Sequence, residues 1–177
     1  MPSIDFFDPT ISKTNCDAIQ FGICDGDPKA TTDDLQRASI KTTQPGTWEA
    51  TVRNSNQRPC VFTPIDHNVP IYKDETKAEK DSSCDGMLVY DGPQKQGIVF
   101  IELKNRRMNW IEEGIQQLAH TIKLFSANHN LSNYSPRRAN LANKRHPHFH
   151  YQQTEPREYF RNHLKIRLNI EAQITLP

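Results

Sequence analysis

The chain has 177 residues, of which 35% are hydrophobic, and its formal net charge at neutral pH is +1. This length indicates one domain, or one domain with an elaboration. The longest strictly apolar run is Ile98–Ile101, far short of the roughly 20 residues that span a bilayer, which argues against a membrane-spanning protein.

The small net charge hides an asymmetry between the two halves of the chain. Residues 1–91 carry 15 acidic and 9 basic side chains, whereas residues 92–177 carry 6 acidic and 13 basic ones. Such a split is a hint of a surface that faces a polyanion. The alternative is that both halves are ordinary solvated surfaces of mixed sign.

The N-terminus lacks the positive and apolar regions of a secretory signal, so we expect a cytoplasmic protein in a reducing environment. No two cysteines have the spacing of a structural zinc knuckle. We therefore expect reduced, packed side chains at all four positions, Cys16, Cys24, Cys60 and Cys84.

In the first half of the chain the patterns are short and interrupted by turn-forming residues. We expect residues 1–60 to form an elaboration that packs on a core domain of residues 61–177. The predicted elements are a short helix at Thr32–Ile40, strands at Thr47–Arg53 and Cys60–Ile65, and a loop or helical turn at Tyr72–Ser83.

From Cys84 onward the pattern becomes clearer. Met87–Tyr90 and Ile98–Lys104 are apolar segments joined by a stretch rich in turn formers, which predicts a β-hairpin. Because its first four residues are all apolar, the second segment is expected to be a central strand covered on both faces.

The clearest helix follows this hairpin. Apolar residues recur with helical spacing from Ile111 to Phe125, and Asn109 with Glu112 matches a capping box, so we predict a helix over about Trp110–Ser126.

Two strands are expected later in the chain. Within the polar stretch 127–163, Arg138–Ala142 is a candidate strand, and Leu164–Leu176 alternates apolar and polar residues. That alternation predicts a half-exposed strand that is antiparallel or lies at a sheet edge.

Three charged residues stand out by their position at the hairpin. Asp85 opens the first strand, while Glu102 and Lys104 end the second strand on one face. Two converging carboxylates suit Mg²⁺ or Mn²⁺, which binds through a few carboxylates together with water and substrate phosphate. The lysine would orient or deprotonate an attacking water, or stabilise charge in the transition state.

These residues resemble the signature of the PD-(D/E)XK nuclease superfamily. The segments Cys84-Asp85-Gly86 and Ile101-Glu102-Leu103-Lys104 match its motif, with Cys84 in the place of the motif's proline. The resemblance implies an α/β (α+β) fold, in which a mixed central sheet is flanked by helices. It further implies that an αβββαβ core of the restriction-endonuclease type covers roughly residues 70–171.

The resemblance also implies roles for individual residues. Asp85, Glu102 and the carbonyl of Leu103 would hold Mg²⁺ or Mn²⁺, and Lys104 would be the catalytic lysine. Many members add a glutamine from the next helix, for which Gln116 and Gln117 are candidates. Many also add a glutamate from the first core helix, and the candidates are Glu49, Glu75 and Glu79.

The basic residues of the second half fit a nucleic-acid partner. Phosphate neutralisation supplies most of the affinity of such binding without sequence preference. The residues that we expect to contact nucleic acid are Arg106, Arg107, Gln117, Lys144 and Arg145. Further basic residues follow, among them Arg137, Arg138, Arg157, Arg161, Lys165 and Arg167.

The sequence thus predicts a metal-dependent nuclease that hydrolyses phosphodiester bonds, with DNA as the expected substrate. A restriction, repair or defence role and a homodimer or larger complex are what the resemblance implies. One alternative is a non-catalytic nucleic-acid-binding or assembly module. Another is a zinc protein that uses the alternating histidines of the segment His146–His150.

Overall fold

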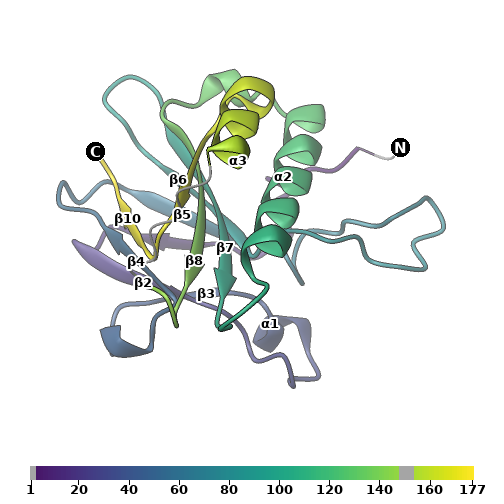
Figure 1. The fold of residues 1–177 in the computed structure, drawn as a ribbon, viewed down its shortest axis with the longest axis horizontal. Helices are drawn as coiled ribbons and strands as arrows, with labels where there is room; N and C mark the ends of the chain where they lie inside the picture. Colours follow the sequence, from purple (N-terminus) through teal and green to yellow (C-terminus); the bar gives the residue numbers. More distant parts are fainter. Residues whose placement is uncertain (1–2, 148–153) are drawn as a thin grey trace.

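The computed structural model describes residues 3–147 and 154–177. The fold is mixed α+β, with two mixed sheets and few helices (Figure 1). In spatial order, the six-stranded sheet contains β1 (Thr14–Cys16), β5 (Cys60–Pro64), β6 (Gly86–Tyr90), β7 (Gly97–Lys104), β8 (Arg137–Asn143) and β9 (Arg167–Ile170). The four-stranded sheet contains β10 (Gln173–Thr175), β4 (Ala50–Arg53), β2 (Gln20–Cys24) and β3 (Ser39–Lys41).

Three of the helical elements lie against the six-stranded sheet. Helix α2 packs on β7 and β8, and α3 with the π-helical turn η3 packs on β9. The helical elements are α1 (Asp33–Gln36), α2 (Ile111–Asn128), α3 (Glu155–Tyr159) and η3 (Phe160–Leu164), with 3₁₀ turns η1 (Pro45–Thr47) and η2 (Leu131–Asn133).

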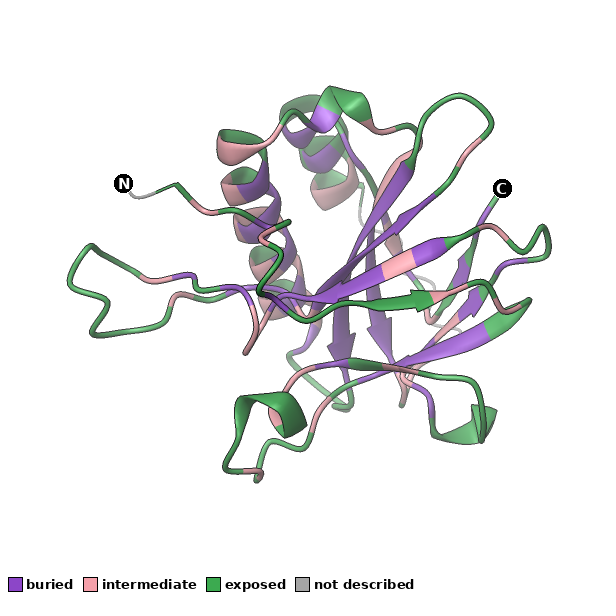
Figure 2. Cartoon of the chain, turned by 180° about the vertical axis from the view of Figure 1, so that it is seen from behind, coloured by how far each residue is buried: buried purple, intermediate pink, exposed green. Residues whose placement is uncertain are grey.

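The central strands β6 and β7 of the six-stranded sheet are buried on both faces (Figure 2). Ile98 and Phe100 of β7 join the core beneath α2, whereas Val99 and Ile101 join the core between the two sheets. All eight residues of β7 are buried, which confirms the predicted central strand. The hairpin is also confirmed, because β6 and β7 pair in antiparallel register.

The expectation of a sheet flanked by helices is only partly correct. Helices cover one face, and the four-stranded sheet covers the other. The first helix of the expected αβββαβ order is not observed, because the described residues 65–85 contain no helix and form a loop closed by a bridge between Tyr72 and Lys80. What remains in order is β5–β6–β7–α2–β8, with β7 and β8 parallel.

Several local predictions need correction. The predicted helix 32–40 shrinks to α1, because Ser39–Lys41 pairs with β2 instead. The strand predicted from Thr47 begins only at Ala50, after the turn η1. The capping box does not form: Asn109 has a left-handed φ of 56°, and α2 begins after Trp110 without a side-chain cap.

The alternation of apolar and polar residues over Leu164–Leu176 corresponds to two strands rather than one. β9 and β10 divide the segment, and each is parallel to its neighbour, β9 to β8 and β10 to β4. Both lie at sheet edges, as predicted, whereas the antiparallel option and the single strand were wrong. Each sheet takes strands from both sides of residue 60, so the two predicted parts of the chain are joined by strand pairing.

Candidate active site

Asp85 and Glu102 lie level with each other across the β6–β7 hairpin. Gly86 pairs with Ile101, so the next residue on each strand stands opposite the other. Oδ2 of Asp85 accepts a hydrogen bond from the backbone N–H of Leu103 at 2.6 Å. The hairpin register therefore brings the two predicted carboxylates together at the end of β7.

Gly86 is required at this place by close packing. A Cβ atom there would lie 2.5 Å from Cε2 and Cζ of the Phe62 ring, which is fully buried in β5. Since that ring has no room to move away, the glycine lets β6 approach β5 and fixes the position of Asp85.

The Glu102 carboxylate is almost completely removed from water, with 2% of its surface exposed. Oε1 accepts from Nζ of Lys104 at 2.8 Å, while Oε2 has no hydrogen-bond partner among the described residues. Burial raises the pKa of Glu102 to about 7, although the Lys104 charge opposes the rise. A buried oxygen without a partner is costly, so this atom needs an explanation.

Asp85 has a similar electrostatic environment. Burial, together with the nearby charge of Glu102, raises the pKa of the Asp85 carboxyl well above its usual range. A bound cation would relieve the repulsion that the Glu102 charge exerts on the Asp85 carboxylate.

Lys104 is held from two sides. Besides Glu102, its Nζ donates to Oε1 of Gln117 at 2.7 Å and lies 3.4 Å from Oε1 of Glu113, both on α2. Burial alone would lower the pKa of Lys104, but the charge and hydrogen bond of Glu102 outweigh it, and the pKa is raised. The amine is therefore a fixed ammonium at neutral pH.

The structure distinguishes the two glutamines of α2. Gln117 accepts from Lys104 and donates through Nε2 to the carbonyl oxygen of Ser83 at 3.3 Å, thereby joining α2 to the start of the hairpin. Gln116 is exposed, and among the described residues its side chain hydrogen-bonds only to Glu112 on its own helix. The structure thus brings Gln117 to the site and leaves Gln116 outside it.

A further carboxylate, Asp25, was missed by the sequence analysis. It directly follows β2 in the other sheet, and its charge contributes to the raised pKa of both Asp85 and Glu102. Its own pKa is raised, first by partial burial and then by the charges of Glu49 and Asp66. The available signal was its place at the end of an apolar strand, the same signal that marked Glu102.

The three candidate upstream glutamates lie in different places. Glu49 accepts from the backbone N–H of Asp25 at 3.2 Å through Oε2, which puts it in the neighbourhood of the site. Glu79 pairs with Lys73 in the exposed loop after β5, and Glu75 is exposed in the same loop.

The two predicted basic pairs emerge at the same edge of the sheet. Arg106 and Arg107 follow the end of β7, and Lys144 and Arg145 follow the end of its parallel neighbour β8. The Arg106 guanidinium lies 2.6 Å from Oε2 of Glu113, while Arg107 is exposed.

The second pair is tied to the backbone and to a polar side chain. Lys144 donates to the carbonyl oxygen of Thr47 at 3.2 Å, and Arg145 donates to Oδ1 of Asn105 at 3.1 Å. Basic side chains therefore border the carboxylate site.

Of the three alternating histidines, the structure describes only His146. The His146 ring stacks on Trp110 with an interplanar angle of 7°, and its Nε2 lies 3.2 Å from the carbonyl oxygen of Arg107. His148 and His150 lie outside the described residues. The stacking gives His146 a packing role beside the site.

The donor set fits a small hard cation. It consists of the Asp85 and Glu102 carboxylates, and Oε2 of Glu102 is buried without a hydrogen-bond partner in the described structure. No group of three or more His, Cys, Asp or Glu side chains in residues 3–147 and 154–177 is arranged to hold a metal. Mg²⁺ needs only one or two protein carboxylates, because water and substrate phosphate fill its other positions.

Comparison with known proteins gives no further guide to function. The sequence matches no family model and no curated protein, and the fold matches no solved structure. Among the described residues, no helix combines the length and the apolar character needed to cross a membrane. All four cysteines are free, and three of them are buried, in line with the expected packing role.

Proposed function

We propose that this protein is a Mg²⁺- or Mn²⁺-dependent nuclease of the PD-(D/E)XK type that hydrolyses phosphodiester bonds, with DNA as the expected substrate. The observation that carries the proposal is the arrangement around Glu102. Asp85 lies opposite it across the hairpin, its Oε2 is buried without a partner in the described structure, and Nζ of Lys104 lies 2.8 Å from its Oε1. Acidic oxygen atoms and a fixed cation at a basic sheet edge suit a phosphate substrate.

Each residue has a separate task in this proposal. Asp85, Glu102 and the Leu103 carbonyl would hold the cation, which when bound supplies Lewis-acid polarisation of a phosphoryl oxygen and a more acidic water. Because its pKa is raised, Lys104 serves as a hydrogen-bond donor that orients water or stabilises negative charge, rather than as a base. Gln117 keeps the ammonium in place.

The border residues would supply affinity. Arg107 and Arg145 are exposed beside the carboxylates and would contact backbone phosphates, which positions a nucleic acid without reading its sequence. Arg106, already paired with Glu113, would contribute by exchanging that partner for a phosphate.

A cleavage assay on the full chain tests the proposal. Supercoiled plasmid, single-stranded DNA and RNA are incubated with Mg²⁺, Mn²⁺, Zn²⁺ or EDTA. We expect cleavage with Mg²⁺ or Mn²⁺, none in EDTA, and loss of cleavage in Asp85→Asn and Glu102→Gln. Glu171→Gln, an exposed carboxylate between β9 and β10, is the matched control and keeps full activity.

Two outcomes would favour the alternatives. Binding of nucleic acid without cleavage under any of these conditions would indicate the non-catalytic module. Activity that requires Zn²⁺ and disappears in His148→Ala would indicate a histidine-based zinc site. Cleavage that survives both carboxylate variants would also refute the proposal.

A further inference from the structure

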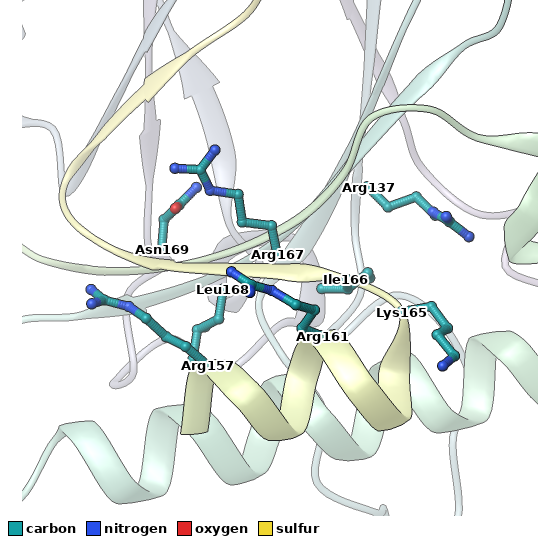
Figure 3. A pocket seen from close by; sticks show the side chains of 8 residues that line it. All are labelled: Arg137, Arg157, Arg161, Lys165, Ile166, Arg167, Leu168 and Asn169. Atoms are coloured by element: carbon teal, nitrogen blue, oxygen red, sulfur yellow. The ribbon is translucent and has the colours of Figure 1, made fainter. Parts of the chain in front are cut away.

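A second concentration of charge lies away from the carboxylates. A cavity of about 630 Å³ opens beside the start of β9, and Ile166, Leu168 and Asn169 form part of its wall (Figure 3). Its remaining lining residues are all cationic: Arg137, Arg157, Arg161, Lys165 and Arg167.

Three elements bring these cations together. Arg157 and Arg161 are four residues apart on the continuous helical segment α3–η3, so they share a face. This segment packs on β9, which carries Arg167, and Arg137 begins the neighbouring strand β8. Residues that are up to 30 positions apart in the sequence thus line one cavity.

The charge in the cavity is not compensated within the described structure. None of the four arginines forms an ion pair or a side-chain hydrogen bond there, and Lys165 donates only to the carbonyl oxygen of Asn162. Arg138, by contrast, donates to the carbonyl oxygen of Thr175 at 2.6 Å. Like charges held together raise the local potential, which an anion with several negative groups would neutralise.

The cavity lies at the end of the parallel strands opposite to the carboxylate site. Arg137 pairs with Ile98 at the start of β7, whereas Lys104 pairs with Asn143 at its end. Arg167 pairs with Arg138, which is level with Val99, so Arg137 and Arg167 lie three to four residues of strand, or roughly 10–13 Å, from the level of Glu102. They also lie on β8 and β9, whereas the carboxylates lie on the β6–β7 hairpin. The arginine cavity is therefore distinct from the proposed metal site.

The residues that line the cavity indicate which kind of anion it would bind. The described lining contains cations, two aliphatic side chains and one asparagine, and it has no aromatic ring on which a base could stack. Arginine forks bind phosphate oxygens well. These features suit the sugar-phosphate backbone of a nucleic acid better than a free nucleotide.

We infer that the arginine cavity is a second phosphate-binding site, which anchors the backbone of the nucleic acid away from the proposed metal site. The choice of nucleic acid rests on the proposed function.

Binding in the absence of cleavage tests this inference. The anisotropy of a fluorescein-labelled duplex is measured with the full chain in EDTA over a series of salt concentrations. For Arg161→Ala with Arg167→Ala, we expect the Kd to rise about tenfold or more, and the slope of log K against log salt to weaken by about 1.8, since each phosphate contact contributes ~0.9. The control Lys73→Ala with Lys77→Ala removes the same charge from an exposed loop and should bind as the wild type does.

The outcomes separate this inference from the nuclease proposal. An unchanged Kd and salt slope in the arginine double variant, with an unchanged circular dichroism melting curve, would overturn the inference even if the protein cleaves DNA. Wild-type binding to tripolyphosphate that the variant loses, without a change in duplex affinity, would also overturn it. Failure of cleavage leaves the binding result intact, because EDTA prevents the reaction in every arm.

Discussion

The charged side chains at the two ends of the parallel strands differ in burial and in pairing. At the carboxyl end, Glu102 and Lys104 are buried and bonded to each other and to α2. At the amino end, Arg161 and Arg167 are exposed and have no partner in the described structure. Buried charges must satisfy one another for the fold to be stable, whereas exposed ones remain available for a ligand. We therefore expect substitutions at the first end to change stability and chemistry together, and those at the second end to change binding alone.

The largest effect is expected for Lys104→Met. Loss of the fixed ammonium should lower the cleavage rate about 10²–10³-fold, as does the loss of one preorganised donor in other active sites. The unfolding free energy at pH 8 should fall by about 3 kcal/mol, because Glu102 is left buried without its partner. Urea titrations at pH 8 and pH 5.5 check this. The loss should be smaller at pH 5.5, where Glu102 takes up a proton, and an equal loss at both values would contradict the assignment.

The pH dependence of stability in EDTA should reveal the buried carboxylate. The pKa of Glu102 rises from 4.5 to about 7 on folding, so the folded state binds more protons between these values. The contribution of Glu102 to the unfolding free energy is therefore most favourable below pH 4.5, and it falls by about 2–3 kcal/mol as the pH rises to 7.

Subtracting the unfolding free energy of Glu102→Gln from that of the wild type isolates the contribution of Glu102 from those of other acids. The difference in unfolding free energy, measured by urea titration at intervals from pH 4 to pH 8, should follow the same fall. A difference that stays flat over this range would show that Glu102 titrates normally.

Gly86→Ala tests the packing that fixes Asp85. The added methyl group would meet the buried Phe62 ring at 2.5 Å, so we expect a loss of about 1–3 kcal/mol in urea unfolding and weaker cleavage. Gly46→Ala, where a Cβ meets nothing within 4 Å, is the matched control. Equal stability of the two variants would mean that the hairpin moves freely to accept the methyl group.

The smallest stability effect is expected at the arginine cavity. Removal of Arg161 and Arg167 breaks no ion pair or side-chain hydrogen bond in the described structure, so the unfolding free energy should change by less than about 0.5 kcal/mol. Thermal melts at low and high salt measure it. A loss above about 1 kcal/mol would show that these arginines hold the fold together, and the contrast between the two ends would then disappear.

Local patterns were sufficient for part of the site. The hairpin, its central strand and α2 were predicted because apolar periodicity acts over a few residues, and Asp85, Glu102 and Lys104 came with the hairpin. Local reasoning failed where the backbone conformation was decided by packing. Asn109, for example, adopts a left-handed conformation instead of capping α2.

The sequence by itself determined the β6–β7 hairpin, the main helix α2 and the three charged residues of the hairpin, because each depends on neighbours in the chain. Only the tertiary structure decided that β10 pairs with β4 rather than extending β9, that Asp25 approaches from another sheet, and that Gln117 rather than Gln116 holds Lys104. It alone gathered the arginines of α3, η3, β8 and β9 into one cavity. The physical reason is that these juxtapositions arise from the burial of faces contributed by distant segments, which no local periodicity encodes.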